Sequence, residues 1–564
     1  MRRSTRTCVA ATVAGEEGRD VAPHPLSGFV GRRMSQAAAR IDHQTRWRPA
    51  PELVAGVMII LLAAGAALAG ASARIDGVRY FWLDDDMMIS MRYSRNLAEG
   101  HGLVFNPGER VEGYSNFLWV AVLALVHLLS PGDARAAAAV VAINACLAIG
   151  VLLAGRRLLA GLGASSRATH AAFTLALAVC VDLLYWSANG FETTLLTLLF
   201  TAIVCRLVRA PAGEIRRGTA LLLAALPLVR ADGLVHWAAA ALPALALSPR
   251  RSRDAMRLAA SLLPAGMHLA FRLLYYGEWL PNTAHLKVLG VEGKALQGAG
   301  YLARFVLAYA LPLAFAGASI VLRATRQKLA LLACAGTIAS YVVAVGGDNF
   351  PHARFLAPLV PLLLALAFAG VEELVTASRL RTTLAGAVAL AVFAFAGIHR
   401  PADLRSVNGG PEQGTVTGVL ISRHTSPGAV VAVVAAGAVP YFSRRATIDL
   451  LGKVDPVLAH RAGAPGVQVG HSKYAPEVSF ARRPDLVVLL GPPANVRRLV
   501  EHSDDPAAAG NYNAAIVLSE EFRRDYLGQP SPLPYLQQHG SVYARRDSPE
   551  AAALVQWVEP RIGG

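Results

Sequence analysis

Long apolar runs alternate with short polar loops through residues 51–398, and a mixed composition follows in residues 399–564. The first run, 53–73, carries no charged residue and is close to the roughly 20 residues that a membrane-spanning helix needs. Residues 1–50 contain nine arginines and no long apolar core, so we expect a disordered cytoplasmic tail there. The pattern therefore predicts an α-helical polytopic membrane domain over 51–398 and a soluble domain over 399–564.

Ten more apolar runs follow the first one, so we expect about 11 spans in total. Their residue ranges are 136–155, 168–186, 193–208, 219–229, 234–247, 258–275, 301–322, 329–346, 355–371 and 382–398. Another apolar stretch, 117–130, is too short to cross a bilayer comfortably. Its placement decides on which side of the membrane every later loop falls.

Basic residues in the loops indicate how this short stretch is placed. If it lies at the outer surface as a re-entrant or interfacial helix, every arginine-rich loop from Arg156 to Arg381 is cytoplasmic, together with the N-terminus. Such a distribution agrees with the usual excess of Lys and Arg in cytoplasmic loops, whereas a crossing at 117–130 would reverse it. We therefore predict that the first outer loop, 75–135, and the C-terminal domain lie on the extracytoplasmic side.

Composition supports a membrane protein and argues against nucleic-acid binding. Only 16% of the residues are charged, whereas a soluble globular protein has roughly 25%, and 54% are hydrophobic. The formal net charge is +16, but Lys and Arg lie mostly in short loops, where anionic lipid head groups are their expected partners. The C-terminal domain contains no cysteine, so we expect it to fold without a disulfide.

Three consecutive acids, Asp84, Asp85 and Asp86, follow the first apolar run closely. Charged residues so near a membrane are rare unless they face water, a cavity or a reaction. Helical spacing places Arg92 on the same face as Asp85. Adjacent carboxylates repel, so one can stay ionised as a base while the other is protonated, bound to a divalent cation or paired with arginine. We predict that Asp85 and Asp86 are catalytic and that Arg92 binds a donor phosphate; an acidic helix cap is the alternative.

The other candidate residues lie in loops that this topology places outside. For binding of a sugar or acceptor we predict Glu112, Tyr114, Asn116, Glu192 and Asp348, and for binding of the donor phosphate Lys287, His352 and Arg354. Aromatic residues near 112–119 could equally mark the membrane interface, and Arg354 could be an ordinary interfacial arginine. Arg230 and Asp232 separate two short runs, where the alternative to a role in the site is a buried pair that stabilises the bend.

The C-terminal region reads as a small α/β domain. Two apolar segments, 430–443 and 485–493, are bounded by Gly and Pro and predict buried strands. Small residues in AAGAVP predict a turn with close backbone approach. The segments 448–460 and 470–477 are candidates to reach the active site, and a purely structural domain is the alternative.

The motif LDDDMMISMRYSRNLAEGHGLVFNPGERVEGYSNFLW resembles the first outer loop of GT-C fold glycosyltransferases, especially the mycobacterial terminal β-(1→2)-arabinofuranosyltransferases. The resemblance continues through NGFETTL, RADG, YYGEWLPNTAHLK, GGDNFPHARFLAPLVP and YFSRRATIDLLGKVDP. It implies a bacterial plasma-membrane enzyme that uses a polyprenyl-phosphate sugar donor and an acceptor glycan, with inversion, on the extracytoplasmic side. The family's paired acids align with Asp85 and Asp86, whereas Asp84 is an extra acid and Met87 replaces a small residue.

Two other classes of function remain open from the sequence. A polysaccharide or lipid transporter would be expected to show duplicated halves with matching broken spans, and the sequence shows none. A non-catalytic envelope-assembly protein would not need an acidic pair beside a basic cluster. We therefore predict a lipid-linked sugar transferase without an obligatory cofactor, with arabinofuranose as one candidate sugar.

Overall fold

The computed structural model describes residues 50–129, 132–210, 214–287, 293–348, 350–377, 409–463, 470–489, 512–526 and 541–558. Residues Glu52–Gly564 belong to one compact unit. Of the predicted tail, 1–50, only residue 50 is described, and the last predicted run, 382–398, lies wholly outside the described residues. Both therefore stay predictions.

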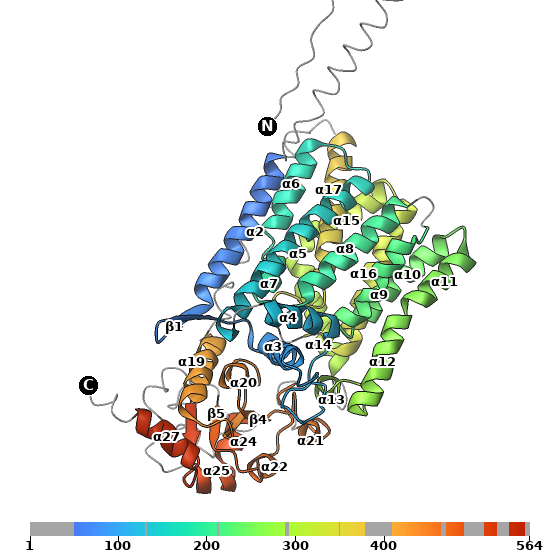
Figure 1. Ribbon diagram of the computed structural model, residues 1–564. Helices are drawn as coiled ribbons and strands as arrows, with labels where there is room; N and C mark the ends of the chain where they lie inside the picture. Colours follow the sequence, from blue (N-terminus) through green and yellow to red (C-terminus); the bar gives the residue numbers. More distant parts are fainter. Residues whose placement is uncertain are drawn as a thin grey trace, which may run out of the picture. The chain divides into compact units, whose positions relative to one another are not determined.

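The first two-thirds of the chain is helical, as the apolar runs predict (Figure 1). The helices are α2 (Pro51–Gly70), α3 (Asp85–Ala98), α4 (Phe117–Leu129), α5 (Asp133–Gly161), α6 (Arg167–Ala178), α7 (Val181–Ala188), α8 (Thr193–Arg209), α9 (Arg217–Val229), α10 (Gly233–Leu247), α11 (Arg251–Ser261), α12 (Leu263–Tyr276), α13 (Asn282–Lys287), α14 (Lys294–Ala308), α15 (Ala310–Leu322), α16 (Arg326–Val345), the 3-10 turn η2 (Ala357–Leu359) and α17 (Val360–Ala377). A two-stranded antiparallel ribbon, β1 (Ser72–Ile75) and β2 (Val78–Phe81), links α2 to the acidic loop.

Within the described residues, five helices are long and apolar enough to cross a membrane. They are Pro51–Gly70, Asp133–Gly161, Arg251–Tyr276, Arg326–Val345 and Ala357–Thr376. Two bent pairs raise this number to seven if each is one broken span, namely α6 with α7 at 46° and α14 with α15 at 80°. The short stretch at 117–130 forms the 13-residue helix α4. The predicted count of eleven spans remains a prediction.

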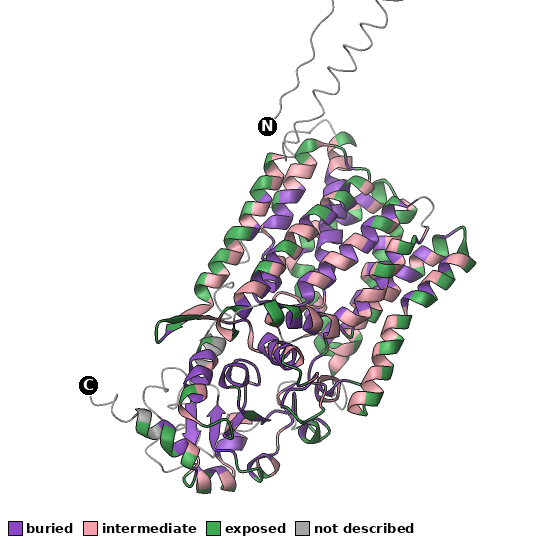
Figure 2. Ribbon diagram, viewed as in Figure 1, coloured by how far each residue is buried: buried purple, intermediate pink, exposed green. Residues whose placement is uncertain are grey.

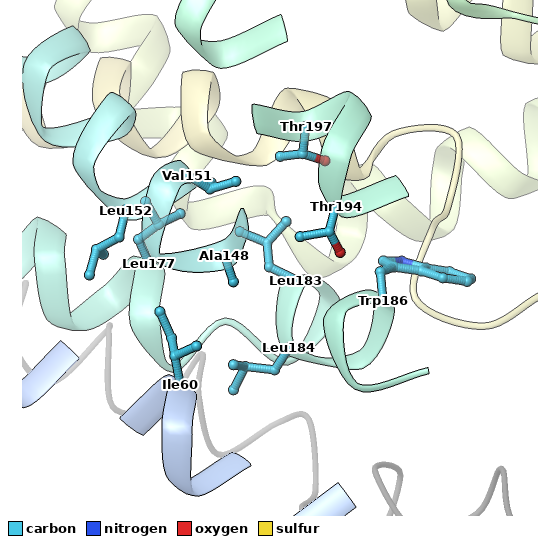
Figure 3. Close-up of a pocket in the computed structure, with 10 residues that line it drawn as sticks. All are labelled: Ile60, Ala148, Val151, Leu152, Leu177, Leu183, Leu184, Trp186, Thr194 and Thr197. Carbon is cyan, nitrogen blue, oxygen red and sulfur yellow. The ribbon is translucent and has the colours of Figure 1, made fainter. Parts of the chain in front are cut away.

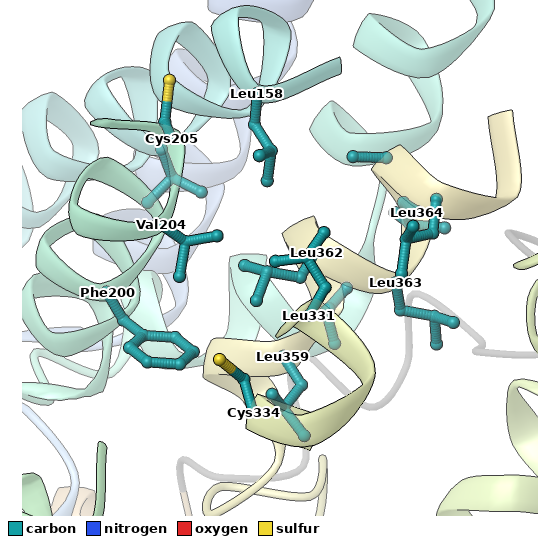
Figure 4. Close-up of a cluster of buried hydrophobic side chains, with 14 of the residues drawn as sticks. Leu158, Phe200, Val204, Cys205, Leu331, Cys334, Leu359, Leu362, Leu363 and Leu364 are labelled. Carbon is teal, nitrogen blue, oxygen red and sulfur yellow. The ribbon is translucent and has the colours of Figure 1, made fainter. Parts of the chain in front are cut away.

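The membrane part packs through its apolar side chains. Figure 4 shows one region of this core, where Phe200 and Val204 of α8 face Leu331 and Cys334 of α16 and the leucines of α17. In contrast, α12 has no buried residue, and Leu274 exposes 87% of its surface (Figure 2). Exposed leucines at this density agree with a helix that faces lipid rather than water.

The C-terminal part contains a four-stranded sheet in the order β4-β3-β5-β6. The elements are α19 (Gly409–His424), β3 (Val430–Val433), α20 (Ala438–Ser443), β4 (Ala446–Asp449), α21 (Pro456–Ala459), α22 (Pro476–Phe480), β5 (Leu486–Leu489), α24 (Tyr512–Val517), α25 (Glu520–Asp525), β6 (Ser541–Ala544) and α27 (Pro549–Val558). Strand β3 is parallel to β4 and β5, and β6 is antiparallel to β5. Both predicted strands exist, but the first ends at Val433, because the chain turns at Gly437 into α20.

The membrane part and the C-terminal part contact each other at α3 and α20, which lie side by side in Figure 1. The buried guanidinium of Arg92 donates to the backbone oxygens of Phe105, Pro440 and Arg445 and to the side chains of Asn106 and Thr447. These bonds connect α3 to the loop that follows it and to the C-terminal part. They also give buried carbonyl oxygens the hydrogen-bond donors that such groups need. The start of α3, which carries the acids, is therefore held both by the membrane part and by the C-terminal part.

Candidate active site

Asp84 begins the acidic site as the N-cap of α3. Its side chain accepts a 3.0 Å hydrogen bond from the backbone N–H of Asp86, and its own carbonyl accepts from Met87 and Met88. This is the ordinary capping role of an aspartate. The acidic cap considered as an alternative is thus correct for Asp84, although it does not account for the next two acids.

Asp85 is held by the C-terminal part. Its two carboxylate oxygens accept hydrogen bonds from the backbone N–H groups of Gly437, at 3.1 Å, and Ala438, at 2.8 Å. Gly437 is required here, since a Cβ atom at this position would lie 1.8 Å from the backbone oxygen of Asp85. The close backbone approach predicted for AAGAVP is therefore confirmed, and its partner is the acidic loop.

Asp86 forms an ion pair with Lys453, which lies between β4 and α21. The distance between Lys453 Nζ and Asp86 Oδ1 is 2.6 Å, and Lys453 is 9% exposed. Burial alone would lower the pKa of Lys453, but the carboxylates of Asp86 and Asp85 raise it above its usual value. Lys453 is therefore charged at neutral pH and neutralises part of the acidic triplet.

The electrostatics of the triplet differ from one acid to the next. Burial, followed by the neighbouring charges of Asp86 and Asp85, raises the pKa of Asp84 from 3.8 to about 7. Burial also raises the pKa of Asp85, while Lys453 and the Ala438 N–H oppose the shift. A carboxyl group with a pKa near 7 can exchange protons at neutral pH. The site therefore contains both an ion-paired carboxylate and a carboxyl group that is easily protonated.

Arg354 contributes a second cation to this region. Its Nε lies 2.6 Å from Asp348 Oδ2, and its guanidinium lies over the ring of Phe350 at 4.6 Å and near that of Phe191 at 5.6 Å. Burial would lower the pKa of Arg354, but Asp348, then Glu192 and Asp86, raise it above the usual value. Arg354 therefore interacts electrostatically with Asp86 of the acidic triplet.

His352 is held by side chains of α7. Its backbone has a left-handed conformation, with φ of 57°, and its Nδ1 lies 2.9 Å from Asp182 Oδ1. Trp186 donates a hydrogen bond to the carbonyl of His352, and Tyr185 packs against the imidazole at 4.3 Å. The ring is therefore positioned by α7, which the sequence did not indicate.

The predicted sugar and acceptor residues form buried networks beside the acids. Asn116 accepts a hydrogen bond from Ser90 of α3 and donates one to Glu192 at 3.0 Å. Glu192 in turn lies 3.7 Å from Arg230, which makes a two-bonded ion pair with Asp232. The Arg230–Asp232 pair at the bend between α9 and α10 is thus the buried pair given as an alternative above.

Glu112 and Tyr114 form a second network. Glu112 pairs with Arg272 of α12, and its carbonyl accepts from the backbone N–H of Asn282. The Tyr114 ring packs edge-on against Tyr93 at 5.1 Å, and its hydroxyl accepts a hydrogen bond from Tyr276. These groups are buried, so they shape the loop from inside rather than form an exposed platform.

Of the other predicted phosphate-binding residues, Arg92 is bound elsewhere and the side chain of Lys287 is not among those described. Arg92 points away from Asp85, because its five hydrogen bonds go to carbonyls and side chains of the loop and the C-terminal part. The prediction of a phosphate-binding Arg92 is therefore corrected to a structural role. Lys287 is the last residue of α13, and its side chain lies outside the described residues.

Sequence reasoning missed Lys453 as a site residue, although it lies in the segment 448–460 that was expected to approach the site. Asn282 fixes this segment by donating to the carbonyls of Gly452, Lys453 and Asp455. Nothing in the sequence pairs Asp86 with a residue 367 positions away. The Lys453–Asp86 ion pair places one positive charge at the acid pair, and a divalent cation there stays a prediction.

An apolar cavity lies within the membrane part. It is lined mainly by side chains of α5 and α7, with Ile60 of α2, Leu177 of α6, and Thr194 and Thr197 of α8 (Figure 3). Trp186, which packs near Arg354, lies at one side of it. No acid of the triplet lines this cavity, so it is separate from the charged cluster.

Comparisons with known proteins give a consistent picture. A family described as a domain of unknown function (DUF8728) matches residues 404–540. Terminal beta-(1->2)-arabinofuranosyltransferase from Corynebacterium glutamicum is 30% identical over 345 residues, which cover 53% of this chain and 49% of that protein. The protein of the same name from Mycobacterium tuberculosis is 31% identical over 248 residues, covering 41% and 38%. The chain thus spans about half, or less, of the length of these curated relatives.

Solved structures agree on the fold. ArnT from Cupriavidus metallidurans, bound to undecaprenyl phosphate, matches with a TM-score of 0.57 and 15% identity, covering 88% of this chain and 98% of that one. The Archaeoglobus fulgidus oligosaccharyltransferase matches with a TM-score of 0.52 and 11% identity, covering 88% and 73%. These matches confirm the predicted fold class: the chain is a mostly helical membrane protein with the GT-C fold.

Proposed function

We propose that this protein is a membrane glycosyltransferase that transfers a sugar from a polyprenyl-phosphate donor to a glycan of the cell envelope, with inversion at the anomeric carbon. The observation that carries the proposal is the ion pair of Asp86 with Lys453 inside the acidic triplet at the start of α3. Arg354, which pairs with Asp348, adds a cation on which the charge of Asp86 acts. Acids and cations at one point suit a reaction in which a hydroxyl loses a proton and a phosphate leaves.

The reaction forms one bond and breaks one. The acceptor hydroxyl oxygen attacks the anomeric carbon of the sugar, the bond between this carbon and the phosphate oxygen breaks, and polyprenyl phosphate leaves. The hydroxyl proton passes to a carboxylate. We assign this base to Asp86, because its carboxylate pairs with the Lys453 ammonium group, whereas both oxygens of Asp85 already accept backbone hydrogen bonds.

The donor phosphate is assigned to the cationic side of the cluster. Arg354 presents a planar guanidinium, which suits two-point contact with phosphate oxygens, and His352 lies two residues away. The structure of ArnT with undecaprenyl phosphate supports a lipid phosphate as the ligand of this fold. The names of the two curated relatives support arabinofuranose as the sugar.

Glu192, Asn116 and Asp348 are the proposed contacts to the sugar or acceptor, directly or through the networks that they form beside the acids. The proposed orientation places this site and residues 399–564 outside the cytoplasm, as the arginine-rich loops require. A membrane-impermeant acceptor can then reach the site directly.

Purified protein with a polyprenyl-phosphoryl arabinofuranose and a soluble arabinan acceptor tests the proposal. We expect transfer by the wild-type chain and a loss of about 10²–10⁴-fold in rate for Asp86→Asn, the usual contribution of a general base. Asp547→Asn is the matched control, because Asp547 is 62% exposed and pairs with Arg483 and Arg545. Lipid movement across liposomes without any transfer would instead support a flippase.

A further inference from the structure

Two histidines and one glutamate lie together outside the acidic cluster. Glu278 comes from the segment that joins α12 to α13, His285 lies in α13, and His460 directly follows α21 of the C-terminal part. One ligand atom from each residue lies within 4.8 Å of the others. His285 Nε2 is 3.8 Å from Glu278 Oε2, and His460 Nε2 is 3.8 Å from Glu278 Oε1. The carboxylate thus lies next to both imidazole nitrogens.

In each imidazole Nε2 is the nitrogen that faces Glu278. His460 Nδ1 lies 2.8 Å from the carbonyl of Pro456, so Nδ1 donates and Nε2 is the acceptor nitrogen. Among the described residues, His285 Nε2 has no hydrogen-bond partner although the atom is buried. The two ring centroids lie 4.1 Å apart with an interplanar angle of 34°, so the two imidazoles are direct neighbours. Buried polar atoms are usually hydrogen-bonded, so a bound ligand would explain why His285 Nε2 has no partner.

We propose that Glu278, His285 and His460 bind a divalent transition metal of the Zn²⁺ type. Two neutral imidazoles and one carboxylate form a recurrent three-ligand set for zinc, which leaves one position for water. The hydrogen bond from His460 Nδ1 to a backbone carbonyl is the usual outer contact that orients such a ligand. Mg²⁺ and Ca²⁺ prefer oxygen ligands, so this set discriminates against them.

The metal would join two parts of the chain beside the acidic cluster. Asn282, between Glu278 and His285, bonds the carbonyls of Gly452, Lys453 and Asp455, and Lys473 Nζ bonds those of His285 and Ala459. A bound metal would therefore stabilise the same contact between α13 and residues 452–460 that positions Lys453. The site is distinct from the proposed transfer chemistry, because none of its three residues touches the acidic triplet in a hydrogen bond or ion pair among the described residues.

Metal titration of the full-length protein in detergent, after treatment with a chelator, tests this site. We expect one Zn²⁺ to bind per chain and Co²⁺ to give a visible absorption band, with no competition from Mg²⁺. His460→Ala and Glu278→Gln change exposed side chains, so the variants should fold. Each should weaken binding by at least the 10–100-fold that loss of an outer partner alone costs.

His101→Ala is the matched control, because His101 is exposed and lies near a single carboxylate, that of Glu99. Thermal unfolding gives an independent readout, since a ligand that binds only the folded state raises the midpoint. Zn²⁺ should raise the midpoint of the wild type and of His101→Ala, and not that of the double variant Glu278→Gln/His460→Ala. Unchanged Zn²⁺ affinity in that double variant, or no Zn²⁺ binding by the wild type, would overturn the proposal, whatever the outcome of the transferase assay.

Discussion

The ammonium group of Lys453 lies 2.6 Å from the carboxylate of Asp86, although the two residues are 367 positions apart in the chain. Asp86 belongs to the first turn of α3 in the membrane part, and Lys453 belongs to the C-terminal part. The C-terminal part therefore supplies a charged group to the site, and it also supplies the backbone N–H groups that hold Asp85. These contacts support the proposal that the C-terminal part contributes to the site.

Replacing Lys453 by Met should lower both activity and stability. Asp86 would lose a charged hydrogen bond that contributes about 1.5–3 kcal/mol, and its carboxylate would lack a counter-charge. Thermal unfolding and transfer rate measure the two effects. In the double variant Lys453→Met/Asp86→Asn, the unfolding midpoint should recover partly while transfer stays low, because the two residues are coupled. Strictly additive losses of stability would show that the ion pair does not form.

Replacing Arg354 by Ala should mainly weaken use of the donor. A lost charged hydrogen bond to phosphate costs about 1.5–3 kcal/mol, which is roughly 10- to 150-fold in kcat/KM for the donor. Arg110→Ala is the control, because Arg110 is exposed and lies over the ring of Tyr275. Donor titrations of both variants check the prediction. If Arg354→Ala retained the wild-type dependence on donor concentration, Arg354 would not bind the phosphate.

Replacing Gly437 by Ala should separate α3 from α20. The new methyl group would start 1.8 Å from the backbone oxygen of Asp85, and backbone atoms cannot move aside as a flexible side chain can. Overpacking of this kind costs about 1–3 kcal/mol or more. Gly428→Ala is the matched control, since its methyl group would meet only Ser426 at 3.7 Å. Equal unfolding midpoints for the two variants would contradict the close packing of α3 on α20.

Asp84 should make stability depend on pH between about 4 and 7. Its pKa is about 7 in the folded protein and near 3.8 when exposed, so the folded state holds a proton that the unfolded state releases. This contribution to stability is complete below about pH 4 and is lost as the pH rises through 7. Thermal unfolding across this range should show a decline that Asp84→Asn removes. An identical pH profile for wild type and variant would mean that Asp84 is not protonated at neutral pH.

The predicted orientation can be tested by cysteine labelling in intact cells. Arg110 and Arg251 are both exposed, and the loop charges place them on opposite sides of the membrane. A cysteine at 110 should react with an impermeant reagent from outside, and one at 251 should react only after permeabilisation. Glu112 is unsuitable because it is buried with Arg272. Reaction at 251 but not at 110 would reverse the topology.

The sequence by itself determined the helical membrane part, the position of the short helix α4, and the acidic loop at the start of α3. These features depend on local patterns, such as apolar runs of known length and an aspartate cap, which need no distant partner. Strands β3 and β5 and the close backbone approach at Gly437 could be predicted for the same reason. The described residues contain each of these elements near its predicted place.

Only the tertiary structure decided which charged groups meet. Arg92 has helical spacing from Asp85, yet its five hydrogen bonds go elsewhere, because carbonyls of the C-terminal part lie within its reach. Lys453 carried no local signal, and its pairing with Asp86 depends on how two distant segments pack. Charge pairs across long sequence separations leave no periodic pattern in the sequence. Which residues pair depends on how distant segments pack in space, and not on the neighbours of each residue along the chain.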